Sequence, residues 1–280
     1  MKPLEPILIV DLFPAVREAL LELLSGLSEE EWSRPTVCAG WSVKDVALHL
    51  LGDDVGRLSR KRDSFGGAAF VPQADADFEA QLVAFINEAN ERWLQATRRI
   101  SPHLLCDLLR FMGGETQRYF QSLDLFQIDE PVSWAGPDPA PVWLDIAREY
   151  TERWLHQQQI RDAVEKPGLK ERRFYAPVLD TFVRALPHTF RDVDVAEGAQ
   201  VKLIITGDAG GEWYLVRVDG KWSLYLDADA EPAAAVVMDQ ETAWRLFTKG
   251  ISKDEASANA TLSGDRSLGM KVLDTVSIIA

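Results

Sequence analysis

The 280-residue sequence lacks any run of 18 or more apolar residues, so it predicts no transmembrane helix. It contains only two cysteines, Cys38 and Cys106, which are too few for a disulfide framework and do not have the spacing of a zinc finger. The N-terminal stretch is interrupted by Asp11 and has no small-residue cleavage site after it. We therefore expect no secretory signal and a location in the reducing cytoplasm.

Positive charge is also scarce. The sequence contains 30 Lys and Arg residues but 44 Asp and Glu residues, which gives a formal net charge of -14. A chain this acidic repels phosphate backbones and anionic lipids, so we expect neither a nucleic acid nor a membrane as its partner. The hydrophobic fraction of 46% is typical of a globular protein. The length corresponds to about two domains.

Helical periodicity dominates the first part of the chain, residues 1–168. Apolar residues recur there at steps of three and four, and Ser28 and Ser42 stand where they can cap helices. We expect long helices over 7–25, 42–62, 75–99, 103–126 and 142–166. Four prolines between positions 131 and 141 predict a rigid linker before the last of these helices.

The pattern changes near residue 170. A helix fits residues 175–186, and strands of alternating polarity follow at 201–205, 213–218, 221–226 and 234–238. Asp219-Gly220 supplies the two residues that a type I′ hairpin turn favours. Helices fit 241–247 and 267–276, with a short strand at 261–262 between them. We therefore expect a small α+β domain over residues 169–280.

Two of the four histidines are candidates for a metal site. His49 lies outside the apolar face of its predicted helix, and this spacing alone favours a solvated histidine. Glu152 and His156 are four residues apart on the last long helix, so their side chains share one face. That spacing is more often a surface ion pair. If the two helices are antiparallel neighbours, however, the three residues would supply three metal ligands and leave a fourth position open.

Several residues near these three could take other roles in the site. Asp45, Asp53 and Glu149 lie on the same helix faces, where each could orient a ligating imidazole or replace one of the three ligands. Cys38 precedes the helix of His49, but nothing in the sequence sets a histidine base beside it, which favours a structural thiol. Among the aromatic residues, Trp41 and Trp154 could line a cleft around the three candidate ligands.

Two stretches of the sequence resemble a known family. The segment from Trp32 to Leu50, which contains Cys38-Ala39-Gly40-Trp41-Ser42 and His49, resembles the signature of the DinB/YfiT-like superfamily. It is most similar to the branch of mycothiol-dependent maleylpyruvate isomerases. The second signature of that branch is Glu-x-x-x-His followed by a short stretch containing Ile-Arg-x-Ala, which here runs from Glu152 to Ala163. The C-terminal residues 201–280 resemble sterol carrier proteins.

This resemblance implies a fold, a site and an activity. The fold is a DinB-like four-helix bundle over residues 1–168, followed by the α+β domain similar to sterol carrier proteins. The site is a divalent metal, usually zinc, bound by His49, Glu152 and His156. The activity uses a low-molecular-weight thiol cofactor, such as mycothiol or bacillithiol, whose thiolate attacks a small electrophilic substrate. If the thiolate adds to a double bond and leaves again, the enzyme is an isomerase; if it stays attached, the enzyme is a thiol transferase.

Some questions stay open at the level of sequence. Relatives often carry Asp at the position of Gln159, so the activity can differ from theirs. Two imidazoles and a carboxylate also suit nickel or iron. The protein could instead be a non-catalytic metal-containing protein that holds a small apolar ligand, or a stress-related protein without catalysis. Arg217 and Arg245 could bind a substrate carboxylate, although surface roles are more common. Both a monomer and a homodimer are compatible with the sequence.

Overall fold

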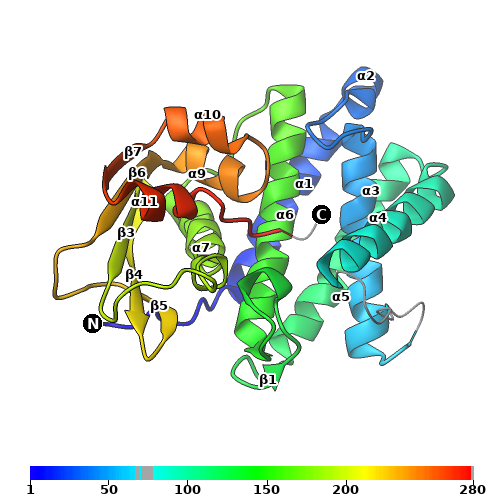
Figure 1. The fold of residues 1–280 in the computed structure, drawn as a ribbon. Coiled ribbons are helices and arrows are strands. Elements are labelled where there is room, and N and C mark those ends of the chain that lie inside the picture. The colour runs from blue at the N-terminus through cyan, green and yellow to red at the C-terminus, as the bar shows by residue number, and fades with distance from the viewer. Residues whose placement is uncertain (67–69, 71–77, 279–280) are drawn as a thin grey trace. The chain divides into compact units, whose positions relative to one another are not determined.

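The computed structural model describes residues 1–66, 70 and 78–278, and the chain forms two compact units. The helical unit contains Ile9–Asp124 and Glu149–Leu169, and the sheet unit contains Met1–Leu8, Leu125–Arg148 and 170–278. Neither unit is one continuous stretch of sequence, because helix α6 (Val142–Val164) contributes to both (Figure 1). A helical N-terminal region is thus followed along the chain by a sheet-containing region, as expected.

The helical unit contains α1 (Phe13–Ser25), α2 (Glu29–Ser33), α3 (Val43–Arg57), α4 (Phe78–Thr97), α5 (Pro102–Gln121) and most of α6. A 3-10 turn, Val10–Leu12, precedes α1, and a π-helical turn, Leu58–Arg62, follows α3. When this π-helical turn is counted with α3, the observed helices match the predicted ones to within six residues at each end, and the largest differences are the later start of α1 and the earlier end of α5. The predicted start of the third long helix, at 75–77, lies outside the described residues.

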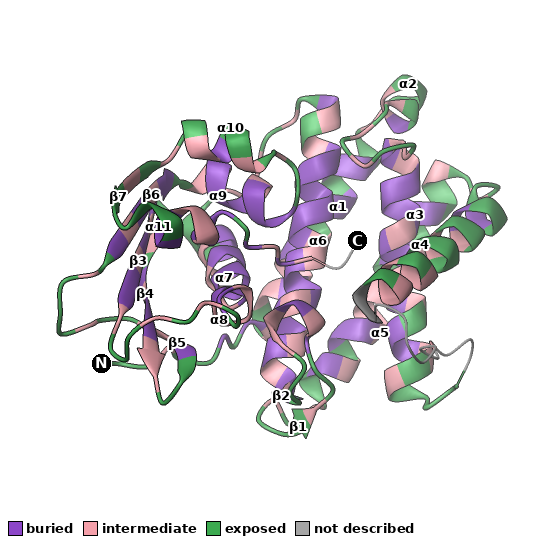
Figure 2. Ribbon diagram, viewed as in Figure 1, coloured by how far each residue is buried: buried purple, intermediate pink, exposed green. Residues whose placement is uncertain are grey.

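The core of the helical unit explains why these helices form. Leucines of α1 and two leucines of α5, Leu105 and Leu109, are buried together with Val46 and Ala47 of α3 and Ile160 of α6 (Figure 2). The start of α3 is fixed by a reciprocal capping box. In it Ser42 Oγ accepts from the backbone N–H of Asp45, and Asp45 Oδ2 accepts from the backbone N–H of Ser42. The register of α3, and with it the position of His49, is therefore set locally.

The sheet unit holds a five-stranded sheet of order β5-β4-β3-β6-β7. Strands β3 and β6 are parallel, and the other neighbours are antiparallel. Asp219 and Gly220 have positive φ angles of 51° and 73°, which confirms the predicted tight hairpin between β4 and β5. The strands span β3 (Gln200–Thr206), β4 (Gly211–Val218), β5 (Lys221–Tyr225), β6 (Ala234–Asp239) and β7 (Thr261–Gly264). The helices are α7 (Arg172–Val183), α8 (Leu186–Thr189), α9 (Gln240–Phe247), α10 (Lys253–Ala258) and α11 (Arg266–Val272).

The proline-rich stretch before α6 is more ordered than a linker. Strand β1 (Ile128–Asp129) pairs antiparallel with β2 (Ala140–Pro141), and a 3-10 turn, Ser133–Ala135, lies between them. Trp134 of this turn is 7% exposed and packs with Leu144 of α6. The prediction of a rigid linker was wrong because the burial of this tryptophan folds the segment onto its neighbours.

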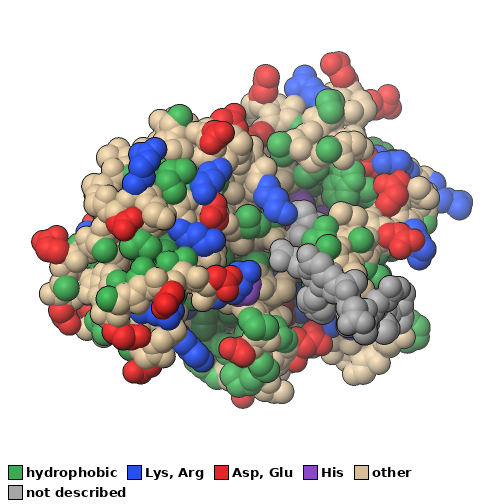
Figure 3. Space-filling model, in the orientation of Figure 1, with side chains coloured by type: hydrophobic (Ala, Val, Ile, Leu, Met, Phe, Trp, Pro, Cys, Tyr) green, Lys and Arg blue, Asp and Glu red, His purple; other side chains and the backbone are tan. Residues whose placement is uncertain are grey.

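Two properties of the surface bear on possible partners. No helix within the described ranges combines the length and the hydropathy that crossing a membrane requires. On the face seen in Figure 3, acidic and basic side chains are interspersed.

Candidate metal centre

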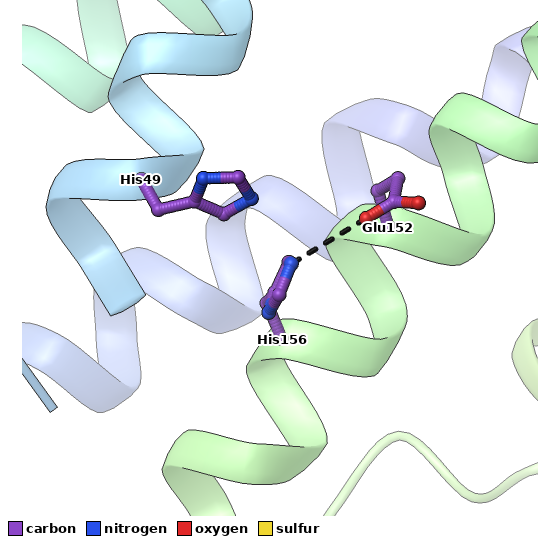
Figure 4. Close-up of side chains that lie close together, drawn as sticks. All are labelled: His49, Glu152 and His156. Carbon is purple, nitrogen blue, oxygen red and sulfur yellow. Dashed lines mark ion pairs between the residues drawn. The ribbon is translucent and has the colours of Figure 1, made fainter. Parts of the chain in front are cut away.

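Three side chains from two helices converge inside the helical unit. His49 comes from α3, and Glu152 and His156 come from α6 (Figure 4). The ring centroids of the two histidines are 4.6 Å apart, and the rings are inclined by 77°. One ring nitrogen of each histidine and one carboxylate oxygen of Glu152 all lie within 4.8 Å of one another. The structure therefore brings together all three residues that the sequence singles out.

The environment of His49 differs from the solvated one that its position outside the apolar face of the helix predicts. Its side chain is only 12% exposed, so the prediction of a solvated histidine was wrong. The ring of Trp41 covers it at a centroid distance of 5.1 Å, and the side chain of Asn90 in α4 hydrogen-bonds to it. The polar face of α3 is buried because the segment before α3 and the neighbouring helix α4 close over it.

His156 makes contacts through both of its ring nitrogens. Its Nε2 lies 3.4 Å from Oε2 of Glu152, one turn earlier on α6. Its Nδ1 donates to Oε1 of Gln159 over 2.7 Å, and the same oxygen accepts a hydrogen bond from Sγ of Cys38 over 3.2 Å. Cys38, which also packs against the core of the helical unit, therefore adjoins the site. Sequence reasoning missed this role because no spacing relates residue 38 to a helix more than 100 residues later.

The protonation of the three residues follows from their burial and their charges. Burial lowers the pKa of His156, but hydrogen bonds with Cys38 and Glu152 and the negative charge of Glu152 outweigh it and raise that pKa to about 10. Burial and the adjacent positive charge of His156 lower the pKa of His49 to about 3. Without a metal at neutral pH, His156 and Glu152 therefore form an ion pair beside a neutral His49.

The three acidic residues that sequence reasoning kept as alternatives have different roles. Asp45 caps α3 and accepts a hydrogen bond from Arg98 Nε over 2.8 Å. Glu149 forms ion pairs with two arginines. Asp53 Oδ2 lies 3.4 Å from His49 Nε2. Burial, and after it the negative charges of Glu149 and Glu152, raise the pKa of Asp53 to about 7. Of the three, Asp53 is thus the carboxylate that lies next to a histidine of the site.

A buried network of ion pairs ties α3 to α6 next to the site. Glu149 accepts hydrogen bonds from Arg57 and from Nη1 of Arg153, the latter over 2.8 Å. Arg153 also donates through Nη2 to Oδ1 of Asp54 over 2.6 Å. Because Asp54 and Arg57 belong to α3, the network holds the two helices that carry His49, Glu152 and His156 in one register.

The remaining candidates have structural roles. Trp154 is fully buried, and its Nε1 donates to the backbone carbonyl of Leu169 over 2.9 Å, so it belongs to the core. In the sheet unit, Arg217 pairs with Asp194, and the guanidinium group of Arg245 stacks on Trp244. Cys106 is buried in the core of the helical unit, as expected.

The donor atoms of the three residues are of the types that bind zinc and related divalent cations. Bonds of about 2.0–2.1 Å at tetrahedral angles set two ligand atoms about 3.4 Å apart. The observed separation of 3.4 Å between His156 Nε2 and Glu152 Oε2 equals this value. The upper limit of 4.8 Å for the whole set leaves only small side-chain rotations to bring all three atoms to one centre.

Comparisons with known proteins agree with the sequence signatures. The family model described as mycothiol maleylpyruvate isomerase N-terminal domain matches residues 13–161. Two solved structures match with a TM-score of 0.53 and 12% sequence identity over 91% of this chain and 91% of the matched chain. One is the crystal structure of the mycothiol-dependent maleylpyruvate isomerase, and the other is a mutant of that enzyme with a histidine replaced by alanine. At this identity the likeness shows a shared fold. No curated protein matches the chain.

Proposed function

The chain belongs to the family of the mycothiol maleylpyruvate isomerase N-terminal domain, and from this premise we propose that it is a metal-dependent enzyme that uses a low-molecular-weight thiol cofactor. We propose isomerisation of a small electrophilic substrate as its reaction, and thiol transfer as the variant in which the thiol stays attached. The observation that carries the proposal is the convergence of two imidazoles and one carboxylate within 4.8 Å. Family membership favours this activity over a non-catalytic ligand-binding protein.

His49, Glu152 and His156 would hold the metal, most favourably zinc, as three protein ligands. Three ligands leave a coordination position free, which is what distinguishes a catalytic zinc site from a closed structural one. When bound, the metal supplies positive charge that lowers the pKa of a thiol and keeps it in its nucleophilic thiolate form.

The chain's own residues prepare the site in three ways. Trp41 covers His49 and limits the access of water to that side. The carboxylate of Asp53, whose Oδ2 lies 3.4 Å from Nε2 of His49, packs beside this imidazole and restricts its position. Arg153 and Glu149 keep α6 against α3, so that the ligand atoms stay within reach of one ion. Each contribution reduces the reorganisation that binding of the metal and the thiol requires.

The proposal extends to the thiol, the substrate and the domains. The thiol is mycothiol or a close analogue, and the substrate is a small unsaturated acid of the maleylpyruvate type, the substrate in the name of the two similar structures. We assign residues 1–168 to a DinB-like four-helix bundle and 169–280 to a domain similar to sterol carrier proteins. The enzyme acts in the cytoplasm, where such thiols stay reduced.

Thiol binding at the metal is tested with cobalt-loaded protein. Titration with mycothiol should produce a saturable near-ultraviolet band from sulfur-to-cobalt charge transfer, because the free position accepts the thiolate. We further expect cis–trans isomerisation of maleylpyruvate only when both metal and mycothiol are present.

The control is mycothiol methylated on sulfur, which keeps the sugar groups but cannot form a thiolate. It should leave the cobalt spectrum unchanged and support no turnover. An identical spectral response to both compounds, or isomerisation at the same rate without thiol, would contradict the proposed function.

A further inference from the structure

We propose that Gln159 is a positioning residue for His156, and that the thiol of Cys38 holds the Gln159 amide in the orientation this role requires. The inference deepens the proposed function and rests on it, because its purpose is to prepare His156 as a metal ligand. Gln159 is 9% exposed and His156 is 8% exposed, so the contact between them is shielded from water.

The geometry assigns a separate task to each nitrogen of His156. Nδ1 lies 2.7 Å from Gln159 Oε1, whereas Nε2 faces Glu152 Oε2 at 3.4 Å. An amide oxygen can only accept a hydrogen bond, so Nδ1 has to keep its proton. Nε2 is then the nitrogen that can offer a lone pair to an ion between the two helices. A metal-ligating histidine commonly donates its second N–H to an acceptor of this kind.

Cys38 contributes through the orientation of the amide. A glutamine amide turned over by half a rotation would present its NH₂ group to Nδ1, and the proton would then have to sit on Nε2, where it blocks the metal. The thiol of Cys38 donates to Gln159 Oε1 over 3.2 Å, so it stabilises the orientation in which the oxygen faces His156. A thiol is a weak donor, and we expect its contribution to be smaller than that of the amide.

An amide at this position differs from a carboxylate in charge. Gln159 fixes the proton on Nδ1 of His156 but adds no negative charge to a site that already contains Glu152 and Asp53. A carboxylate would make the imidazole a stronger electron donor and would bring a third acidic group into a buried site. Gln159→Glu is therefore the conservative variant, since it retains the acceptor oxygen while changing only the charge.

The test measures zinc affinity of the full chain by competition with a chelator. Gln159→Leu should bind zinc about 10- to 100-fold more weakly than wild type, the range for loss of an outer-shell partner. Gln159→Glu should restore affinity to the wild-type level or above it. Cys38→Ala should weaken binding by about two- to tenfold, as expected for one weak hydrogen bond.

The matched control is Gln158→Leu, the same substitution at the preceding residue. Gln158 is 1% exposed and donates to the backbone carbonyl of Gly168 over 3.0 Å, so this variant also loses a buried hydrogen bond, but away from His156. Its zinc affinity should stay within about twofold of wild type, because it changes no contact of the site.

A spectroscopic signal separates positioning from a general loss of structure. In the zinc-loaded wild-type protein, nitrogen-15 NMR should detect a slowly exchanging proton on Nδ1 of His156, and Gln159→Leu should lose this signal. If Gln159→Leu binds zinc as tightly as wild type, the positioning role is wrong while the metal site stands. If wild type itself binds no zinc, both this role and the proposed function fail.

Discussion

Replacing His156 with alanine is expected to abolish stoichiometric zinc binding. The variant removes one of three protein ligands, so the affinity should fall by more than the factor of about 10 to 100 that outer-shell changes cost. With only Glu152 and His49 as ligands, the variant should lose the ion during dialysis. The metal content of dialysed protein, measured by mass spectrometry, and the chelator-competition affinity give the result directly.

His103→Ala is the matched control for that experiment. His103 lies on α5 with a side chain that is 93% exposed and an acidic neighbour, Asp107, 3.7 Å away, so it repeats the histidine–carboxylate spacing on an open surface. This variant should retain the full metal content. Equal metal content in His156→Ala and wild type would remove the site.

Neutralising Glu149 should cause a large loss of stability. In Glu149→Gln two arginines keep their positive charges in a buried place but lose the carboxylate between them. The side chain of Arg57 is 7% exposed and that of Arg153 is 15% exposed, so water compensates little of the loss. Removing one partner of a buried ion pair costs about 3 to 5 kcal/mol of unfolding free energy.

Urea unfolding followed by circular dichroism measures this change. Glu88→Gln is a suitable control, because Glu88 pairs with Arg92 on the surface, where the two side chains are 62% and 73% exposed. That variant should lose no more than about 1 kcal/mol. Equal losses in the two variants would show that the buried network does not hold α3 and α6 together. Because the network adjoins the site, Glu149→Gln should also weaken zinc binding.

Local signals in the sequence were sufficient for the elements that carry the site. The capping box at Ser42 and Asp45 fixes the start of α3, and the i,i+4 spacing sets Glu152 and His156 on one face of α6. These features depend on contacts within one or two turns, which a sequence displays directly. The same holds for the Asp219-Gly220 turn, whose backbone angles follow from its residue types.

Contacts between distant segments could not be predicted in this way. A helical wheel assigns the polar face of α3 to solvent, but Trp41 and Asn90 cover His49. The wheel equally leaves Asp45, Asp53 and Glu149 as equivalent alternatives. Their different roles depend on their partners. Asp45 and Glu149 bind arginines that lie far away along the chain or on another turn of the helix. The contact of Cys38 with Gln159 joins residues 121 positions apart, and no local pattern encodes it.

Anomalous diffraction at the zinc absorption edge from crystals of the zinc-loaded protein tests the metal site most directly. A single peak is expected among His49, Glu152 and His156, about 2.0–2.1 Å from one nitrogen of each imidazole. A zinc ion bound elsewhere on the protein, with no density between these three side chains, would contradict the account.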